Sequence, residues 1–306
     1  MKPSPVWVLP VIGFCCTGAF AAEHFDFCEL TSQTALRSCQ MGAQSDLLLA
    51  LGKCANVADP AERKACRDQG AADLKDSLLL CDAGFSVRQT GCRRLGGAPY
   101  DPAFDPADFV DKIDNPYFPL TPGTVFVYEG LTTTGFVHTE FFVTHKTVAI
   151  LGVTTVEVHD TVTTDGKLTE DTLDWFAQDK KGNVWYFGEN TMEMVDGRPS
   201  TLDGTFTAGV NGAKPGIVME AHPAIGDFYR QEFDLGNAED FAEVSSLSDA
   251  VNVPAGKFTN CLRTRETTPL EPDLKEAKWY ALGIGNVLTK DLTTGDKTPL
   301  VRIEFR

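Results

Sequence analysis

Six cysteines with mirror-image spacing constrain the first third of this 306-residue chain more than any other feature. The gaps between them are 11, 15, 12, 15 and 11 residues, so the pattern reads the same in both directions about residue 60. The cysteines are Cys28, Cys39, Cys54, Cys66, Cys81 and Cys92. Residues 59–62, Asp-Pro-Ala-Glu, lie at the mirror point and have the pattern of a helix start, with a capping Asp and a Pro in the first turn. The spacing therefore predicts two antiparallel helices that meet near residue 60.

This hairpin selects one disulfide pairing among the fifteen that six cysteines permit. At about 100° per residue, the three cysteines on each side of residue 60 fall on one helix face. Facing helices bring Cα atoms within disulfide reach. The predicted pairs are Cys28–Cys92, Cys39–Cys81 and Cys54–Cys66. A lone two-helix hairpin buries little apolar surface, so cross-links would supply its stability. A zinc site would need closer cysteine pairs than these.

Glycines and leucines of this segment lead to two further expectations. Gly70, Gly84 and Gly91 weaken the second helix and are expected to kink it. The leucines within residues 47–51 and 78–80 exceed what one helix seam can bury. We expect them to dock on the following domain or, alternatively, on a second copy of the chain.

The first 22 residues have the pattern of a signal peptide. A basic residue near the start precedes a short apolar run, and residues 19–21 (Ala-Phe-Ala) fit the small-x-small cleavage rule. Acylation at Cys15 or Cys16 is the alternative, which the bulky Phe14 disfavours. Export to the periplasm or the medium would also permit disulfides. No later stretch is long and apolar enough to predict a membrane span.

Charge excludes one class of partner. After residue 22 the chain carries 26 basic and 43 acidic residues, a formal charge of −17. Residues 101–306 hold 33 of these acidic residues and 17 basic ones. Such a surface repels phosphate, which argues against binding to nucleic acid or anionic membranes.

The remainder of the chain has the composition of an antiparallel β domain. Thr, Val and aromatic residues alternate between turn residues such as Asp165-Gly166, and no long helical segment separates the strands. Predicted strands cover residues 124–130, 136–146, 153–162, 168–178, 184–188, 227–233, 243–246, 257–267, 277–282, 286–291 and 300–305. Glycine-rich residues 200–223 are predicted to form a loop over one mouth of the sheet.

The predicted fold class is therefore α+β, with four segments. A signal peptide (1–22) precedes the disulfide-stapled helical hairpin (23–97). A linker (98–106) then leads to a large curled antiparallel β-sheet (107–306), which forms a half-barrel or a barrel-like domain.

Three segments of the β domain resemble a family of uncharacterised secreted bacterial proteins. They are IDNPYFPLTPGT (113–124), DWFAQDKKGNVWYFGE (174–189) and KWYALGIGNVL (278–288). The resemblance covers nearly all of the β domain but implies no catalytic residues, because the family has no assigned activity. At the level of fold, the domain is also similar to half-barrel domains of exported lipoprotein carriers, which is an analogy only.

Familiar catalytic patterns do not occur in the sequence. It contains no G-x-S-x-G, H-E-x-x-H, phosphate-binding loop, dinucleotide fingerprint or EF-hand loop. His138 and Glu140 share a predicted strand face, which is half a metal site or a solvated face. Cys261 lies in an apolar strand and is interpreted as a buried, inert thiol. No cofactor or metal is predicted.

Candidate ligand-binding residues come from three places in the β domain. Residues on one aromatic hairpin must face both sides of the sheet, because neighbours in a strand point oppositely. An acid and a histidine end the glycine-rich loop, and an arginine and a glutamate share a strand face. The candidates are Trp175, Trp185, Tyr186, Glu220, His222, Arg230 and Glu232.

The favoured hypothesis is an exported, non-enzymatic binding protein that holds a small or apolar ligand, such as a lipid, in its curved sheet. One alternative is a hydrolase that uses acidic residues, with or without Ca²⁺. Its candidate residues are Asp171, Asp174, Glu232, Glu239 and Asp240. The other alternative is a structural or interaction module of the cell envelope.

Overall fold

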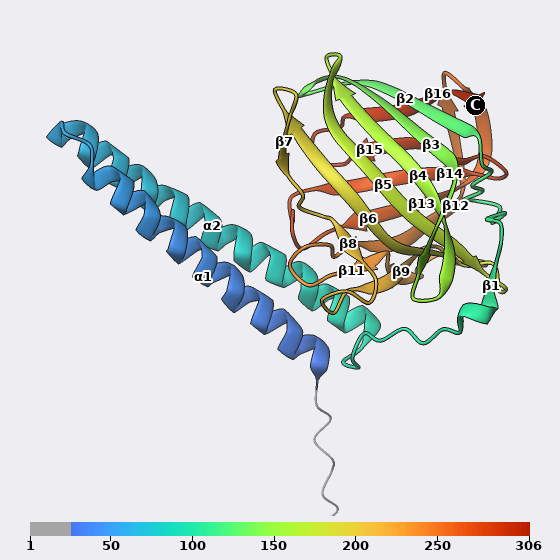
Figure 1. The fold of residues 1–306 in the computed structure, drawn as a ribbon, viewed down its shortest axis with the longest axis horizontal. Helices are drawn as coiled ribbons and strands as arrows, with labels where there is room; N and C mark the ends of the chain where they lie inside the picture. The colour runs from blue at the N-terminus through green and yellow to red at the C-terminus, as the bar shows by residue number, and fades with distance from the viewer. Residues whose placement is uncertain (1–25) are drawn as a thin grey trace, which may run out of the picture.

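A helical hairpin projects from one end of a large antiparallel β-barrel (Figure 1). The structure is a computed structural model, which describes residues 26–306. The predicted signal peptide (1–22) lies outside the described residues. No helix within 26–306 combines the length and apolarity that crossing a membrane requires.

The hairpin consists of α1 (Phe27–Ala55) and α2 (Pro60–Leu95). Asp26 and Asp59 cap the two helices, and the Asp59 carboxylate accepts hydrogen bonds from the backbone amides of Ala61 and Glu62. Disulfides join Cys28 to Cys92, Cys39 to Cys81 and Cys54 to Cys66, the pairs that the mirror spacing predicts. Their Cα separations, 5.5, 5.7 and 5.6 Å, are normal for disulfides.

The glycines of the second helix do not interrupt it, and two of them are contact points with the barrel. A Cβ on Gly84 would lie 2.3 Å from the carbonyl oxygen of Pro269, and one on Gly91 would lie 2.6 Å from the ring of Phe241. These glycines let α2 pack closely against the barrel, and α2 remains one helix of 36 residues.

The expectation that the hairpin leucines dock on the β domain is wrong. Leu48 and Leu79 are 70% and 58% exposed. The contacts between helix and barrel begin at Gly84 and continue toward the end of α2, whereas most of the leucines lie farther out along the hairpin.

The β domain is one antiparallel sheet that curls into a nearly closed barrel (Figure 1). The strands before residue 200 are β1 (Phe109–Val110), β2 (Thr124–Thr132), β3 (Gly135–Ile150), β4 (Val153–Thr164), β5 (Lys167–Asp179), β6 (Val184–Val195) and β7 (Arg198–Thr201). The next are β8 (Phe206–Thr207), β9 (Lys214–Met219), β10 (Phe228–Arg230), β11 (Glu232–Phe233) and β12 (Phe241–Val253). The last are β13 (Gly256–Thr267), β14 (Lys275–Ala281), β15 (Gly285–Asp291) and β16 (Lys297–Phe305).

The strand order explains how the barrel closes. From β12 it runs through β13, β14, β15, β16, β2, β3, β4, β5 and β6 to β9. Strands β10 and β11 are separated by Gln231 alone; β10 pairs with β12, and β11 pairs with β9. This short segment therefore links the two ends of the sheet.

The glycine content of residues 200–223 predicts a loop, but the structure shows that this segment also contains strands. It contains β8 and β9, and β9 pairs with both β6 and β11. Pro215 pairs opposite Glu232 at the short β9–β11 contact. Gly216 lies so close to this segment that an added Cβ would be 2.3 Å from the carbonyl of Gln231.

Aromatic residues occupy both faces of the sheet. Inside the barrel, the ring of Phe176 stacks on that of Tyr186, with centroids 4.7 Å apart. On the other face, Trp185 and Phe187 form a second buried cluster. Phe104, from the predicted linker, packs against both of their rings. The linker thus covers the outer apolar cluster.

Candidate ligand cavity

A cavity of about 460 Å³ lies inside the barrel. Its apolar walls are largely aromatic and include Phe126, Tyr128, Phe141, Phe176, Tyr186 and Tyr280. Six carboxyl side chains also line it, together with one lysine. The carboxyl groups belong to Asp160, Glu170, Glu232, Asp240, Glu266 and Glu276, of which Glu232 and Asp240 lie near the closing segment.

The register of the sheet brings polar and aromatic groups together in the cavity. Asp160 on β4 lies directly between Phe141 on β3 and Thr172 on β5. Directly opposed residues project to the same face of a sheet. Along β5, alternate residues from Glu170 to Phe176 follow this face, since side chains alternate in a strand.

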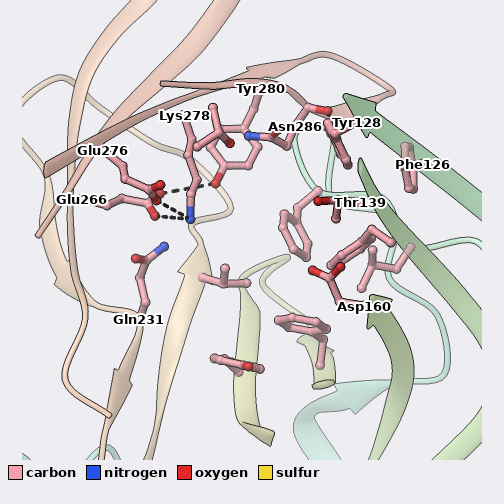
Figure 2. A pocket seen from close by; sticks show the side chains of 18 of the residues that line it. Phe126, Tyr128, Thr139, Asp160, Gln231, Glu266, Glu276, Lys278, Tyr280 and Asn286 are labelled. Atoms are coloured by element: carbon pink, nitrogen blue, oxygen red, sulfur yellow. Dashed lines mark hydrogen bonds and ion pairs between the residues drawn. The ribbon is translucent and has the colours of Figure 1, made fainter. Parts of the chain in front are cut away.

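One wall holds the lysine pole, defined here as Lys278, Glu266 and Glu276 (Figure 2). The ammonium of Lys278 lies 2.7 Å from Glu266 and 3.5 Å from Glu276. Burial alone would lower the pKa of Lys278, but these two carboxylates raise it well above its usual value. Thr264 and Tyr280 also donate hydrogen bonds to Glu266. The lysine is therefore charged and already has its counter-ions.

Asp160, Glu170, Asp174 and Glu189 form a second group, here termed the carboxyl pole. Burial, together with the neighbouring Asp174 and Glu170, raises the pKa of Asp160 well above its usual value. Burial also raises the pKa of Asp174 to about 7, and that of Glu189 to about 8 with Asp174 as a further cause. Near neutral pH this pole thus holds protons that ordinary carboxylates would lose.

Tyr186 connects two members of the carboxyl pole. Its hydroxyl donates a hydrogen bond to Asp174 over 2.5 Å, and it lies 3.0 Å from Glu189. A phenol has one proton to donate. A protonated Glu189 can supply the second hydrogen bond by donating to the phenol oxygen. The three groups therefore form a chain that can hold and share protons.

Two of the predicted ligand-binding residues line the cavity, namely Tyr186 and Glu232. Burial and the neighbouring Asp240 raise the pKa of Glu232 well above its usual value. Trp175 and Trp185 belong instead to the outer apolar cluster, where Trp185 donates a hydrogen bond to Asp179. The structure therefore separates residues that lie close together on the predicted aromatic hairpin.

The other three predicted residues also lie outside the cavity lining. The guanidinium of Arg230 packs over the rings of Tyr100, Phe233 and Phe241. The strand breaks after Arg230, so Arg230 and Glu232 belong to different strands, and of the two only Glu232 lines the cavity. His222 is exposed. Glu220 is partly buried, and burial, with Asp227 nearby, raises its pKa to about 7.

The sequence interpretation missed Asp160 and Lys278. Alternation on β4 could have found Asp160: Val156, Val158 and Val162 share its inward face, so one charged residue interrupts an apolar row. Lys278 lies within one of the resembling segments, but no sequence pattern marks it as a cavity residue. Its partner Glu266 lies on β13, and the register between these strands cannot be deduced from spacing.

Among the residues of the hydrolase alternative, three lie around the barrel interior: Asp174, Glu232 and Asp240. Glu239 is held by Arg88 at the base of the hairpin, at 2.6 Å. Asp171 pairs with His159 at 2.7 Å. Asp171 lies between inward-facing neighbours on β5 and so points out of the barrel. The five acids therefore do not converge.

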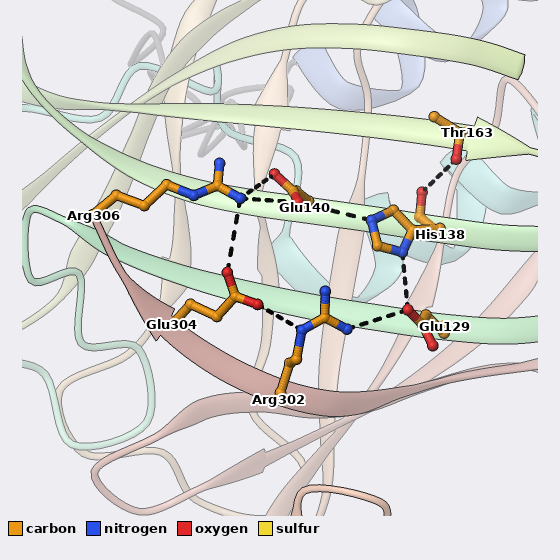
Figure 3. Close-up of polar contacts among 7 residues, drawn as sticks. All are labelled: Glu129, His138, Glu140, Thr163, Arg302, Glu304 and Arg306. Carbon is orange, nitrogen blue, oxygen red and sulfur yellow. Dashed lines mark hydrogen bonds and ion pairs between the residues drawn. The ribbon is translucent and has the colours of Figure 1, made fainter. Parts of the chain in front are cut away.

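His138 and Glu140 lie in a surface charge network rather than a metal site (Figure 3). The ring of His138 lies 3.1 Å from Glu129, which also pairs with Arg302. Arg306 pairs with Glu140 at 2.9 Å. Within residues 26–306, no group of three or more His, Cys, Asp and Glu side chains could hold a metal ion.

Cys261 is buried and makes no disulfide. Burial raises its pKa, and Asp249 adds to the effect. A thiol with a raised pKa is a poor nucleophile, which agrees with the interpretation of Cys261 as inert.

Comparisons with known proteins give one distant similarity of fold. No family model matches the chain, and no curated protein matches it. The predicted resemblance to a secreted bacterial family thus stays a prediction. Among solved structures, the chain is similar to a predicted lipoprotein from Parabacteroides distasonis ATCC 8503, whose crystal structure was determined at 2.70 Å resolution. The two share 14% identity with a TM-score of 0.35, over 64% of this chain and 100% of that one.

Proposed function

We propose that this protein is an exported binding protein that holds one small ligand inside its barrel without transforming it. The cavity is the observation that carries the proposal. Its volume, about 460 Å³, lies within the usual range of small-molecule sites. Aromatic walls with a few converging polar groups are also typical of such sites.

The covalent framework supports a location outside the cytoplasm. Three disulfides fasten the hairpin, and disulfides persist chiefly in oxidising compartments. The predicted signal peptide agrees with this location. We therefore expect the mature protein in the periplasm or outside the cell.

A pair of neighbouring residues on β4 tests where the ligand binds. Val162 lines the cavity, whereas Thr161 points to the other face of the sheet. In Val162→Trp the indole would fill the cavity; in Thr161→Trp it would lie outside. The probe is the neutral dye N-phenyl-1-naphthylamine, whose fluorescence increases in apolar surroundings.

We expect Val162→Trp to weaken dye binding at least tenfold and Thr161→Trp to leave it unchanged, with circular dichroism confirming that both variants fold. Native mass spectrometry of protein purified from its own host would then show any retained ligand. Failure of the unmodified protein to bind the dye or any host molecule would overturn the proposal. Equal weakening by both substitutions would place the site elsewhere.

A further inference from the structure

The carboxyl pole has no positive partner within the described part of the chain. The one lysine of the cavity, Lys278, is already paired with Glu266 and Glu276. No ion pair within residues 26–306 joins a basic side chain to any member of the carboxyl pole. The hydrogen-bond partners of its acids are the hydroxyl groups of Thr172 and Tyr186. Negative charge in this region can therefore be neutralised only by protons or by a bound cation.

Asp160 directs an unsatisfied oxygen toward the cavity. Its Oδ1 atom is buried and has no hydrogen-bond partner among residues 26–306. Figure 2 shows this side chain pointing into the cavity from the wall opposite the lysine pole. Leaving a buried polar atom without a partner is energetically costly, and more so for a charged group. Such an atom in a cavity wall indicates a position where a ligand donates a hydrogen bond.

The surroundings of Asp160 suit a cation with an apolar body. Phe141 lies directly opposite Asp160 on the neighbouring strand, and Tyr128 and Phe126 line the same part of the cavity. Aromatic faces attract ammonium groups and also pack against hydrocarbon. A metal ion is a poorer candidate, because no group of ligating side chains in the described residues could hold one.

We infer that the cavity receives an organic amine, whose ammonium group binds Asp160 beside the ring of Phe141 and whose apolar body fills the aromatic part of the barrel. This inference rests on the proposed binding function and specifies the chemistry of its ligand. A neutral ligand would leave protons as the only compensation of the carboxyl pole, and an anion would be repelled by the negative charge that the pole retains.

The same geometry makes binding dependent on pH. The charged groups that face Asp160 are Glu170 and Asp174 from β5, Glu189 from β6 and Lys278 from β14. With the cavity free of ligand, burial and the neighbouring acids raise the pKa of Asp160, so at a given pH this carboxyl holds its proton more than an ordinary aspartate does. An ammonium group favours the ionised carboxylate and expels that proton. Amine affinity should consequently increase with pH until Asp160 ionises without ligand.

Three probes of similar shape distinguish the contribution of charge to affinity from that of apolar contact. They are 4-phenylbutylamine, 4-phenylbutan-1-ol and 4-phenylbutyrate. Isothermal titration calorimetry is performed with the full mature chain. We expect the amine to bind at least about tenfold more tightly than the alcohol, equivalent to about 1.4 kcal/mol. The butyrate should bind most weakly. Amine affinity should rise between pH 5.5 and 7.5, and titration in buffers of different ionisation enthalpy should show proton release.

Asp160→Asn is the decisive variant, because it keeps the shape of the side chain and removes its charge. It should reduce amine binding to the level of the alcohol, without changing alcohol affinity. Asp171→Asn is the matched control, one strand away on the outer face, and should retain the amine preference. Equal binding of amine and alcohol to the unmodified protein would overturn the amine inference and leave the binding function intact. Binding of none of the probes, nor of the neutral dye, would overturn both.

Discussion

At the scale of single residues, Asp174 and Glu189 make the stability of the ligand-free protein depend on pH. Their pKa values in the folded protein are about 7 and about 8. In an unfolded chain such groups titrate near pH 4. Between these values the folded state binds more protons than the unfolded state. The free energy of unfolding therefore falls as pH rises from about 4 to about 8.

Asp174→Asn should flatten this dependence. Its amide oxygen can still accept the hydrogen bond from Tyr186, while the titrating proton is gone. Urea unfolding at pH 5 and pH 8 should show a smaller stability difference in the variant, by about 1–4 kcal/mol. Asp171→Asn, on the same strand but facing outward, should keep the original difference. A stability that increases with pH in the unmodified protein would contradict the raised pKa values.

Residue-scale sequence reasoning found the cavity only in part. It identified Tyr186 and Glu232 because both lie in conspicuous patterns, an aromatic hairpin and an acid–arginine alternation. Trp175 and Trp185 have equally conspicuous positions but face the opposite side, since neighbours in a strand alternate and Phe176 and Tyr186 point inward. Both faces of this hairpin are aromatic, so the sequence alone does not show which face points into the barrel. The outer face is the one that Phe104 and Phe109 cover.

At the scale of elements, the docking of α2 explains why glycines occur within a long helix. Gly42 of α1 has open space around it, so Gly42→Ala should stabilise the protein by about 0.5–1 kcal/mol through helix propensity. Gly91 contacts the ring of Phe241, so Gly91→Ala should instead destabilise it by about 1–3 kcal/mol. Thermal unfolding of the two matched variants measures both effects. Stabilisation by both substitutions would mean that α2 does not pack on Phe241 in solution.

Element prediction succeeded where local chemistry is strong. The helix start at Asp59 and the tight turn at Asp165-Gly166, both of whose residues have positive φ, are local signals. Strand β9 was missed because Pro215 and Gly216 resemble loop residues. A tertiary contact explains why a glycine occurs in this strand: β9 must approach the backbone at Gln231 closely to close the barrel. No local pattern reports such a contact.

At the scale of the whole molecule, one buried ion pair anchors the hairpin to the barrel. Two nitrogens of Arg88 donate hydrogen bonds to Glu239, and the two side chains are 9% and 1% exposed. Arg94 adds a more exposed pair with Glu243. The hairpin has its own disulfides and the barrel its own core, so the two parts are expected to be separately stable.

Removing one partner of a buried ion pair leaves the other charge uncompensated, at a cost of about 3–5 kcal/mol. In Arg88→Ala we expect the hairpin to detach from the barrel rather than the barrel to unfold, because detachment returns Glu239 to water. Small-angle scattering should then show a larger radius of gyration, and protease should cleave within residues 98–106. The fragment 98–306 should unfold cooperatively and bind the neutral dye as the full chain does. A fragment that aggregates or lacks a cooperative transition would instead show that the hairpin completes the core of the barrel.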